Sequence, residues 1–136
     1  MKQQQDAYIV AATRTPIGRS HKGFFRNYRP DDLLATILKS ALAQVPNLDP
    51  KAIEDIICGC AIPEAQQGLN VARIGAVLAG LPTSVGGITV NRFCASGLSA
   101  VAMAADRIRV GEAEVMIAAG VESMSMVPMM GNSPSL

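Results

Sequence analysis

A chain of 136 residues is long enough for one globular domain, and its 49% hydrophobic content is ample for a packed core. The formal net charge of +1, from 12 basic and 11 acidic residues, argues against nucleic acid and anionic membranes as partners. Charged residues, glycine or proline interrupt every hydrophobic stretch, so we expect no membrane span. Three irregularly spaced cysteines and the lack of a signal-peptide pattern favour the reducing cytoplasm.

The first third of the chain predicts a strand, a loop and a helix. Residues 7–12 form a short apolar run, which we expect to be the first strand. The following loop contains the chain's one histidine, His21, for which we expect a solvent-exposed position. Asp31 or Asp32 can cap a helix whose apolar residues recur at helical spacing over residues 33–42.

Strands and helices alternate through the rest of the chain. A brief helical turn at residues 49–50 precedes a second strand over residues 53–60. A helix follows over residues 70–80, and a third strand over residues 88–90 leads into an Ala-rich helix. Residues 115–121 are strand-like again. This alternation predicts an α/β fold with a mainly parallel sheet.

The Ala-rich helix begins near Cys94 and has no charged residue in its first turns. Small side chains cover several of its faces, which is typical of a helix buried on more than one side. We therefore expect it to lie in the middle of a layered structure. Its C-terminal end contains charged residues, Asp106, Arg107 and Arg109, so we expect that end to be exposed to solvent.

Cys94 is the candidate nucleophile. A cysteine where a strand turns into a helix meets unpaired backbone N–H groups and the positive end of the helix dipole, and both favour the reactive thiolate. Such a turn lies near the carboxyl ends of the strands, where open α/β sheets commonly bind ligands. The alternative is a buried structural cysteine, which is common for this residue type.

Three segments of the chain resemble thiolases. Residues 90–98 (VNRFCASGL) resemble the block around the acylated cysteine of that family. Residues 14–18 (RTPIG) and residues 120–125 (GVESMS) match two further blocks in the same order. The resemblance covers essentially the whole chain and is greatest to 3-ketoacyl-CoA thiolases and acetyl-CoA acetyltransferases.

The resemblance implies a five-layer α-β-α-β-α fold of two similar halves. Residues 1–136 would form an incomplete N-terminal domain, without the CoA-binding loop region and the C-terminal half. Cys94 would take the acyl group of a 3-ketoacyl-CoA, release acetyl-CoA and pass the shortened acyl group to CoA, as in fatty acid β-oxidation, or catalyse the reverse condensation. Its backbone N–H would donate to the oxyanion.

The same resemblance assigns other catalytic groups to the absent half. A histidine that activates the nucleophile and a second catalytic cysteine would lie there, so we expect the isolated segment to be inactive. Coenzyme A is expected as a substrate, with no bound cofactor and no metal, and the full-length enzyme is expected to be a homodimer or tetramer. The residues that would contact coenzyme A are not identified.

Other readings of the sequence compete with this one. Cys58 and Cys60 more readily form a locally packed pair than a metal or redox site, because no second pair of ligands exists. Glu122 could act as a general base, but a role in holding loop backbone is preferred. The rival functions are a non-catalytic thiolase-like module for lipid binding or interaction, and a ketoacyl synthase, against which residues 120–125 argue.

Overall fold

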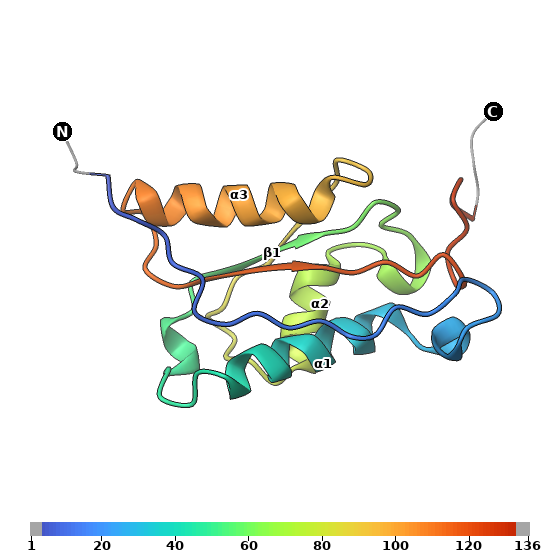
Figure 1. Cartoon of the computed structure of the whole chain (residues 1–136), viewed down its shortest axis with the longest axis horizontal. Helices are drawn as coiled ribbons and strands as arrows, with labels where there is room; N and C mark the ends of the chain where they lie inside the picture. The colour runs from blue at the N-terminus through green and yellow to red at the C-terminus, as the bar shows by residue number, and fades with distance from the viewer. Residues whose placement is uncertain (1–3, 133–136) are drawn as a thin grey trace.

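Three parallel strands form the sheet in the computed structural model, which describes residues 4–132 (Figure 1). The strands are β1 (Asp55–Gly59), β2 (Ile88–Val90) and β3 (Met116–Gly120). Their order is β2-β1-β3, and both ladders are parallel. The predicted alternation of helices with parallel strands is therefore confirmed.

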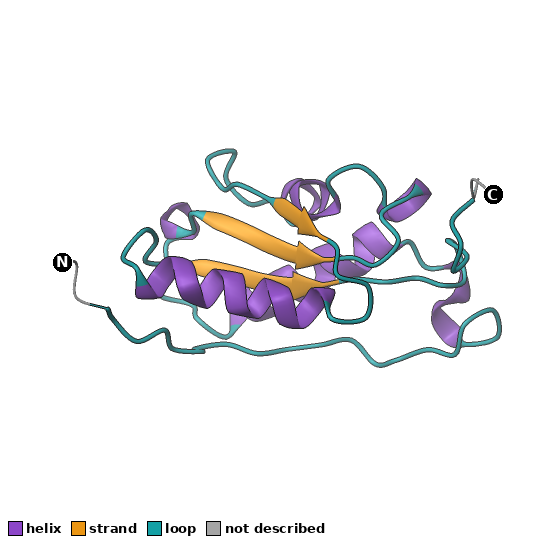
Figure 2. Cartoon of the chain, turned by 90° about the horizontal axis from the view of Figure 1, so that it is seen from above, coloured by secondary structure: helices purple, strands orange, loops and turns teal. Residues whose placement is uncertain are grey.

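Helices cover both faces of this sheet. They are α1 (Pro30–Ala43), α2 (Val71–Leu78) and α3 (Ser96–Arg109), with short 3-10 turns at Phe24–Asn27, Pro50–Ala52 and Ala65–Gln67. α3 lies over the strands on one face, and α1 and α2 lie on the other (Figures 1 and 2). No helix within residues 4–132 is long and apolar enough to cross a bilayer.

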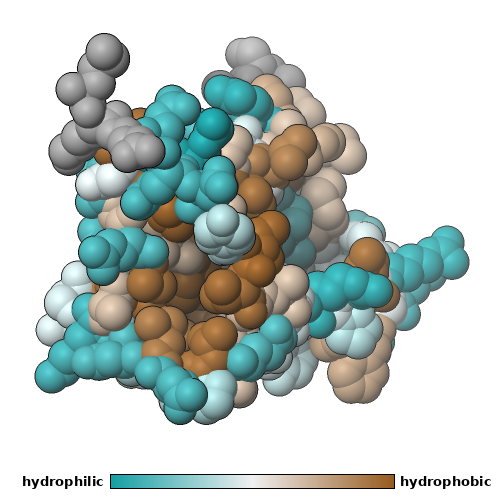
Figure 3. All heavy atoms as spheres, turned by 60° about the vertical axis from the view of Figure 1, so that its left-hand side comes forward, coloured by the Kyte–Doolittle hydropathy of each residue, from teal (hydrophilic) through white to brown (hydrophobic). Residues whose placement is uncertain are grey.

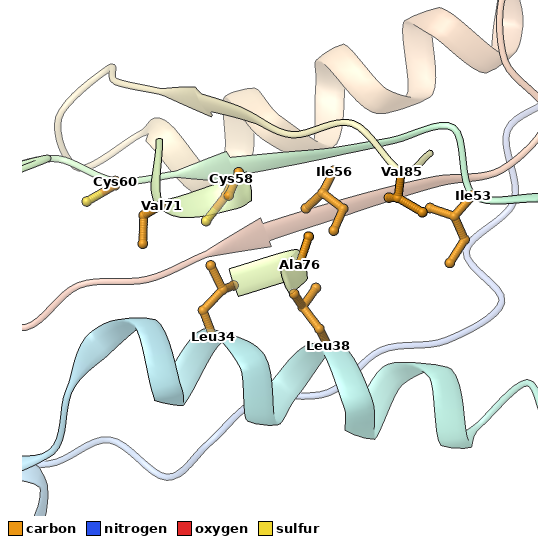
Figure 4. Packing of buried hydrophobic residues seen from close by; sticks show 10 residues of the cluster. Leu34, Leu38, Ile53, Ile56, Cys58, Cys60, Val71, Ala76 and Val85 are labelled. Carbon is orange, nitrogen blue, oxygen red and sulfur yellow. The ribbon is translucent and has the colours of Figure 1, made fainter. Parts of the chain in front are cut away.

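The main core lies between β1 and the pair of helices α1 and α2 (Figure 4). Ile56 and Cys58 point from β1 toward these helices, whereas Ile57, between them in the chain, packs with Ala100 and Ala104 of α3. This alternation is what a strand covered on both faces requires.

Local signals in the sequence placed α2 correctly. The Asn70 side chain caps the helix by accepting a hydrogen bond from the backbone nitrogen of Arg73. Gly80, just beyond the C-cap, has φ of +77°, the left-handed conformation that ends many helices. The brief turn after Asp49 is also confirmed, because its carboxylate accepts from the nitrogen of Lys51 at 2.9 Å.

The predicted cap of α1 is wrong. The helix begins at Pro30 with Arg29 as N-cap, so Asp31 and Asp32 lie in its first turn. Proline is favoured at this first helical position because its fixed φ is already helical and it needs no N–H partner. The Asp31 carboxylate pairs with the Arg29 guanidinium at 2.6 Å instead.

The predicted first strand over residues 7–12 is also wrong. This segment is extended but lies outside the sheet, and Tyr8, Ile9 and Val10 are each at least 76% exposed. Contacts at its two ends hold it, because Gln5 donates to the carbonyl of Arg109 and the nitrogen of Ala12 donates to the Gln44 side chain. Between these points its backbone bonds to no other described residue, because a groove separates it from β3.

The groove has a volume of about 450 Å³ and apolar walls. Its walls come from residues 7–13, α1 and the residues after it, α3, and residues 115–119 in and just before β3. Figure 3 shows hydrophobic side chains around a hollow at this end of the molecule. β3 is the edge strand beside the groove: Gly59 accepts from the nitrogen of Val121, so the backbone groups of Met116, Ala118 and Gly120 face away from β1.

The expected burial of α3 on several sides is not observed among the described residues. Ser96, Ala100 and Ala104 face the sheet and are buried. Leu98 is 75% exposed, and Val101 is also exposed. One face of the helix therefore packs on the sheet, and the face with its larger side chains is open.

Candidate active site

Cys94 lies on the short turn that joins β2 to α3. β2 ends at Val90 and α3 begins at Ser96, so the predicted passage from strand through cysteine to helix is confirmed. Cys94 is a free, exposed thiol, whereas Cys58 and Cys60 are free and buried. The alternative of a buried structural cysteine at position 94 is therefore wrong.

The residue before the cysteine has an unusual backbone conformation. Phe93 has φ of +48°, in the left-handed region that non-glycine residues rarely adopt. Asn91 accepts from the nitrogen of Phe93 at 2.9 Å, and the hydroxyl of Ser96 donates to the carbonyl of Phe93 at 2.6 Å. The backbone N–H and the carbonyl of Phe93 are thus each bonded to a side chain.

The backbone N–H group of Cys94 is free to act as a donor. The nitrogen of Cys94 makes no hydrogen bond within residues 4–132, whereas those of Ala95 and Ser96 donate to the carbonyls of Arg92 and Phe93. The first N–H groups of a helix have no acceptor inside it, so the start of α3 adds further donors beside Cys94. Such groups can stabilise negative charge on sulfur or oxygen.

One glycine lets the start of α3 approach the sheet closely. A Cβ atom at Gly59, the last residue of β1, would lie 2.5 Å from the backbone nitrogen of Gly97 and 2.7 Å from the carbonyl oxygen of Ser96. Gly120 ends β3 beside them. A Cβ atom at Gly120 would lie 3.8 Å from the Cα of Gly97. The absence of a side chain at Gly59 therefore lets the backbone of α3 start directly against the end of β1.

A hollow of about 350 Å³ adjoins these strand ends. It is lined by residues of all three family-like segments, namely Arg14, Thr15, Gly97, Gly120, Val121 and Glu122, together with residues of α1. Cys94 itself is three residues before Gly97 and does not line this hollow. The fold thus brings together segments that are far apart in the sequence.

Glu122 holds loop backbone at the carboxyl ends of β1 and β3, as preferred from the sequence. Its carboxylate accepts from the nitrogen of Ala61 at 2.7 Å and from the side-chain amide of Gln67. Gln67 is fully buried and also accepts from the nitrogen of Ser123 at 2.9 Å. Sequence reasoning missed Gln67, because two of its partners, Glu122 and Ser123, lie more than 50 positions away and no local pattern indicates them.

The two buried cysteines are poor nucleophiles. Burial raises the pKa of Cys58 to about 12, with smaller contributions from the charges of Cys60 and Glu122. Burial, followed by the charge of Glu122, raises the pKa of Cys60 to about 11. Both thiols are therefore protonated at neutral pH, and the part of the chain that the structure describes assembles no group of three metal ligands around them.

His21 lies in an exposed loop, as expected. Its backbone nitrogen donates to the hydroxyl of Ser125 at 2.9 Å. This contact ties the loop that follows residues 14–18 to residues 120–125 through the backbone of His21 rather than through its imidazole.

Comparison with known proteins agrees with these features. Residues 7–135 match the family model described as "Thiolase, N-terminal domain". The 3-ketoacyl-CoA thiolase of Bacillus subtilis (strain 168) is 50% identical over 128 residues, which are 94% of this chain and 32% of that protein. The 3-ketoacyl-CoA thiolase of Aeromonas hydrophila subsp. hydrophila is 50% identical over 125 residues, 92% of this chain and 32% of that protein.

A solved structure gives the same assignment. The crystal structure of the Bacillus anthracis acetyl-CoA acetyltransferase superposes with a TM-score of 0.84 and 31% sequence identity, over 100% of this chain and 35% of that one. The chain thus spans about a third of the length of the relatives it matches. The match to the family model covers nearly all of the 136 residues, and the chain belongs to the thiolase family.

Proposed function

We propose that this chain supplies the nucleophile of an acyltransferase that cleaves 3-ketoacyl-CoA with coenzyme A, or runs the reverse condensation. Cys94 is the nucleophile. The observation that carries the proposal is its position: an exposed thiol on the turn directly before α3, on a residue whose own backbone N–H makes no hydrogen bond within residues 4–132. This is the arrangement that an acyl-transferring cysteine requires.

The proposed reaction consists of two acyl transfers. The Cys94 thiolate attacks the keto carbon, and the C–O π electrons move to oxygen, where the N–H of Cys94 can donate to the oxyanion. When the carbonyl re-forms, the bond between the keto carbon and the neighbouring CH₂ breaks, and that carbon takes a proton to leave as acetyl-CoA. The thiol of a second coenzyme A then attacks the Cys94 thioester, loses its proton to a base and releases the thiolate with the shortened acyl-CoA.

Two protein groups must handle these protons, and the described residues offer none beside Cys94. His21 is in an exposed loop, and Cys58 and Cys60 are buried and protonated. We propose that the remaining two thirds of the family's length supplies an acid and a base. The isolated chain is then inactive, and coenzyme A is recognised largely by residues outside it.

A chimeric protein tests this proposal. Residues 1–136 are joined to the part of the Bacillus subtilis 3-ketoacyl-CoA thiolase that lies beyond its match to this chain. We expect this chimera to release acetyl-CoA from a 3-ketoacyl-CoA in the presence of coenzyme A. Without coenzyme A, mass spectrometry should find the acyl group on the peptide that contains Cys94.

The three cysteines of the chain provide matched controls. Cys94→Ala should reduce the rate of acetyl-CoA release by about a thousandfold or more, because it removes the bond-forming atom. Cys58→Ala and Cys60→Ala should keep most of the activity. Equal activity in Cys94→Ala and the parent chimera would end the assignment.

The finer expectations are proposals of the same kind. We assign the full-length protein to fatty acid oxidation as a homodimer or tetramer, on the strength of the family resemblance, and to the cytoplasm, on the basis of its cysteine usage. The rival is a non-catalytic module for apolar ligands, which the groove of about 450 Å³ beside β3 favours. A folded chimera that binds a fatty acid there but acquires no acyl group on Cys94 would support the rival.

A further inference from the structure

We infer that Asn91 and Ser96 are positioning residues that hold Phe93 in its left-handed conformation and so present Cys94 for reaction, an inference that rests on the proposed function. Neither side chain was singled out for this role by the family resemblance. The structure places both of them on the same residue. Asn91 bonds to the N–H of Phe93, and Ser96 bonds to its carbonyl.

The backbone of Phe93 needs such support. A φ of +48° is found for only a few per cent of residues other than glycine, because the side chain crowds the backbone there. Without its two side-chain partners, this residue would keep only the bond from the Ser96 backbone nitrogen to its carbonyl, and it would rotate toward ordinary φ values. Because Phe93 immediately precedes Cys94, that rotation would carry the thiol away from the start of α3.

The hydroxyl of Ser96 is buried and bonds to two residues of this turn. The residue is 3% exposed, and its hydroxyl accepts from the nitrogen of Arg92 at 2.8 Å while it donates to Phe93. A serine at a helix start usually accepts from an N–H further along the helix. Here the bonds run backward to the residues before Cys94, and the N-cap residue Ala95 has no side-chain bond.

Asn91 joins the turn to the rest of the site. Its amide nitrogen donates to the carbonyl of Ala61 at 3.0 Å, and the nitrogen of Ala61 donates to the Glu122 carboxylate at 2.7 Å. The backbone of Ala61 thus connects residues 120–125 to the turn that carries Cys94. Asn91 fixes the turn relative to the ends of β1 and β3.

The test measures how fast Cys94 in the purified chain reacts with iodoacetamide near neutral pH. Peptide mass spectrometry separates Cys94 from the other cysteines. The variants are Ser96→Ala and Asn91→Ala, each made alone and together with Phe93→Gly. The alkylation rate depends on how much of Cys94 is thiolate, which is favoured at the start of α3. A variant whose turn no longer holds Cys94 there should therefore react more slowly.

The expected result is a dependence on residue 93. With Phe93 present, each loss should slow the alkylation of Cys94 about tenfold, because unsupported non-glycine residues rarely take positive φ. In a chain that carries Phe93→Gly, the same substitution should slow the alkylation of Cys94 only about twofold, since glycine takes positive φ as readily as negative φ. A stabilising role elsewhere in the fold would not depend on residue 93.

The chain contains its own controls. Ser99→Ala removes a hydroxyl one turn further along α3 that bonds to no other described residue, and it should leave the rate unchanged. Cys58 and Cys60 are labelled only when the chain unfolds, so they report any variant that has lost its structure. If Ser96→Ala unfolds, the exposed Asn91 carries the comparison.

The possible failures are distinguishable. If Cys94→Ala keeps the activity of the chimera, the proposed nucleophile is contradicted. If Cys94 carries that activity but Ser96→Ala and Asn91→Ala leave its alkylation rate unchanged, only the positioning role is overturned. Equal losses with Phe93 and with glycine at position 93 would likewise overturn it, because the effect would not pass through that residue.

Discussion

Gly59→Ala should destabilise the chain strongly, because the end of β1 touches the backbone of α3. The new Cβ atom would lie 2.5 Å from the nitrogen of Gly97, whereas ordinary contacts begin at about 3.4 Å. The start of α3 would have to move by about 1 Å. Overpacking of this kind costs about 1–3 kcal/mol, and the upper end applies because the obstructing atoms are backbone and cannot rotate away.

Urea unfolding followed by circular dichroism measures this cost. With a slope of about 1–3 kcal/mol per molar urea, a loss of about 3 kcal/mol lowers the midpoint by about 1–3 M. The displaced turn should also change the alkylation rate of Cys94. Both effects have one cause, the closeness of the two backbones.

Gly97→Ala is the matched control. A Cβ atom there meets nothing within 4 Å, and alanine is the better helix former, so we expect no loss and a gain of up to about 1 kcal/mol. Gly120→Ala, whose Cβ would make an ordinary contact at 3.7 Å, should also be tolerated. An unchanged urea midpoint for Gly59→Ala, or an equal loss for Gly97→Ala, would refute the reasoning.

Three further predictions concern the core and its thiols. In the unfolded chain the two thiols have a pKa near 9, whereas in the folded chain the pKa of Cys58 is raised to about 12 and that of Cys60 to about 11. The free energy of unfolding should therefore be highest below pH 9 and fall as the pH rises toward 11–12. Urea midpoints across that range check this, and Cys58→Ala should flatten the dependence. Asn70→Ala removes the cap of α2 and a bond to the carbonyl of Gly87, at a cost of about 1–2 kcal/mol by the same assay. Leu34→Ala empties a fully buried site and should cost about 2–5 kcal/mol; a loss below 1 kcal/mol would contradict its place in the core.

Elements whose signals are local were predicted well from the sequence. α2 has its cap at Asn70, apolar residues at helical spacing and a glycine beyond its end, and all three lie within a dozen positions. The strands β1 and β2 carry short apolar runs that end at turn residues. The position of Cys94 between β2 and α3 followed from the same kind of pattern.

Features that depend on distant partners were not predictable in this way. Residues 7–12 have the composition of a strand, but a strand exists only beside another edge, and the groove keeps them from β3. The small residues of α3 predicted burial on several sides, yet what covers a helix is set by other segments. Gln67 and the paired bonds to Phe93 escaped notice because they depend on the final geometry.

The open edge of β3 has a consequence for how the chain behaves at high concentration. Its residues, Met116–Gly120, include no charge and no proline, the two features with which proteins usually discourage the addition of foreign strands. The outward N–H and C=O groups therefore offer a template on which another copy can pair. We expect reversible self-association that grows with concentration, and a lysine introduced at Ala118 should suppress it by placing charge on this edge.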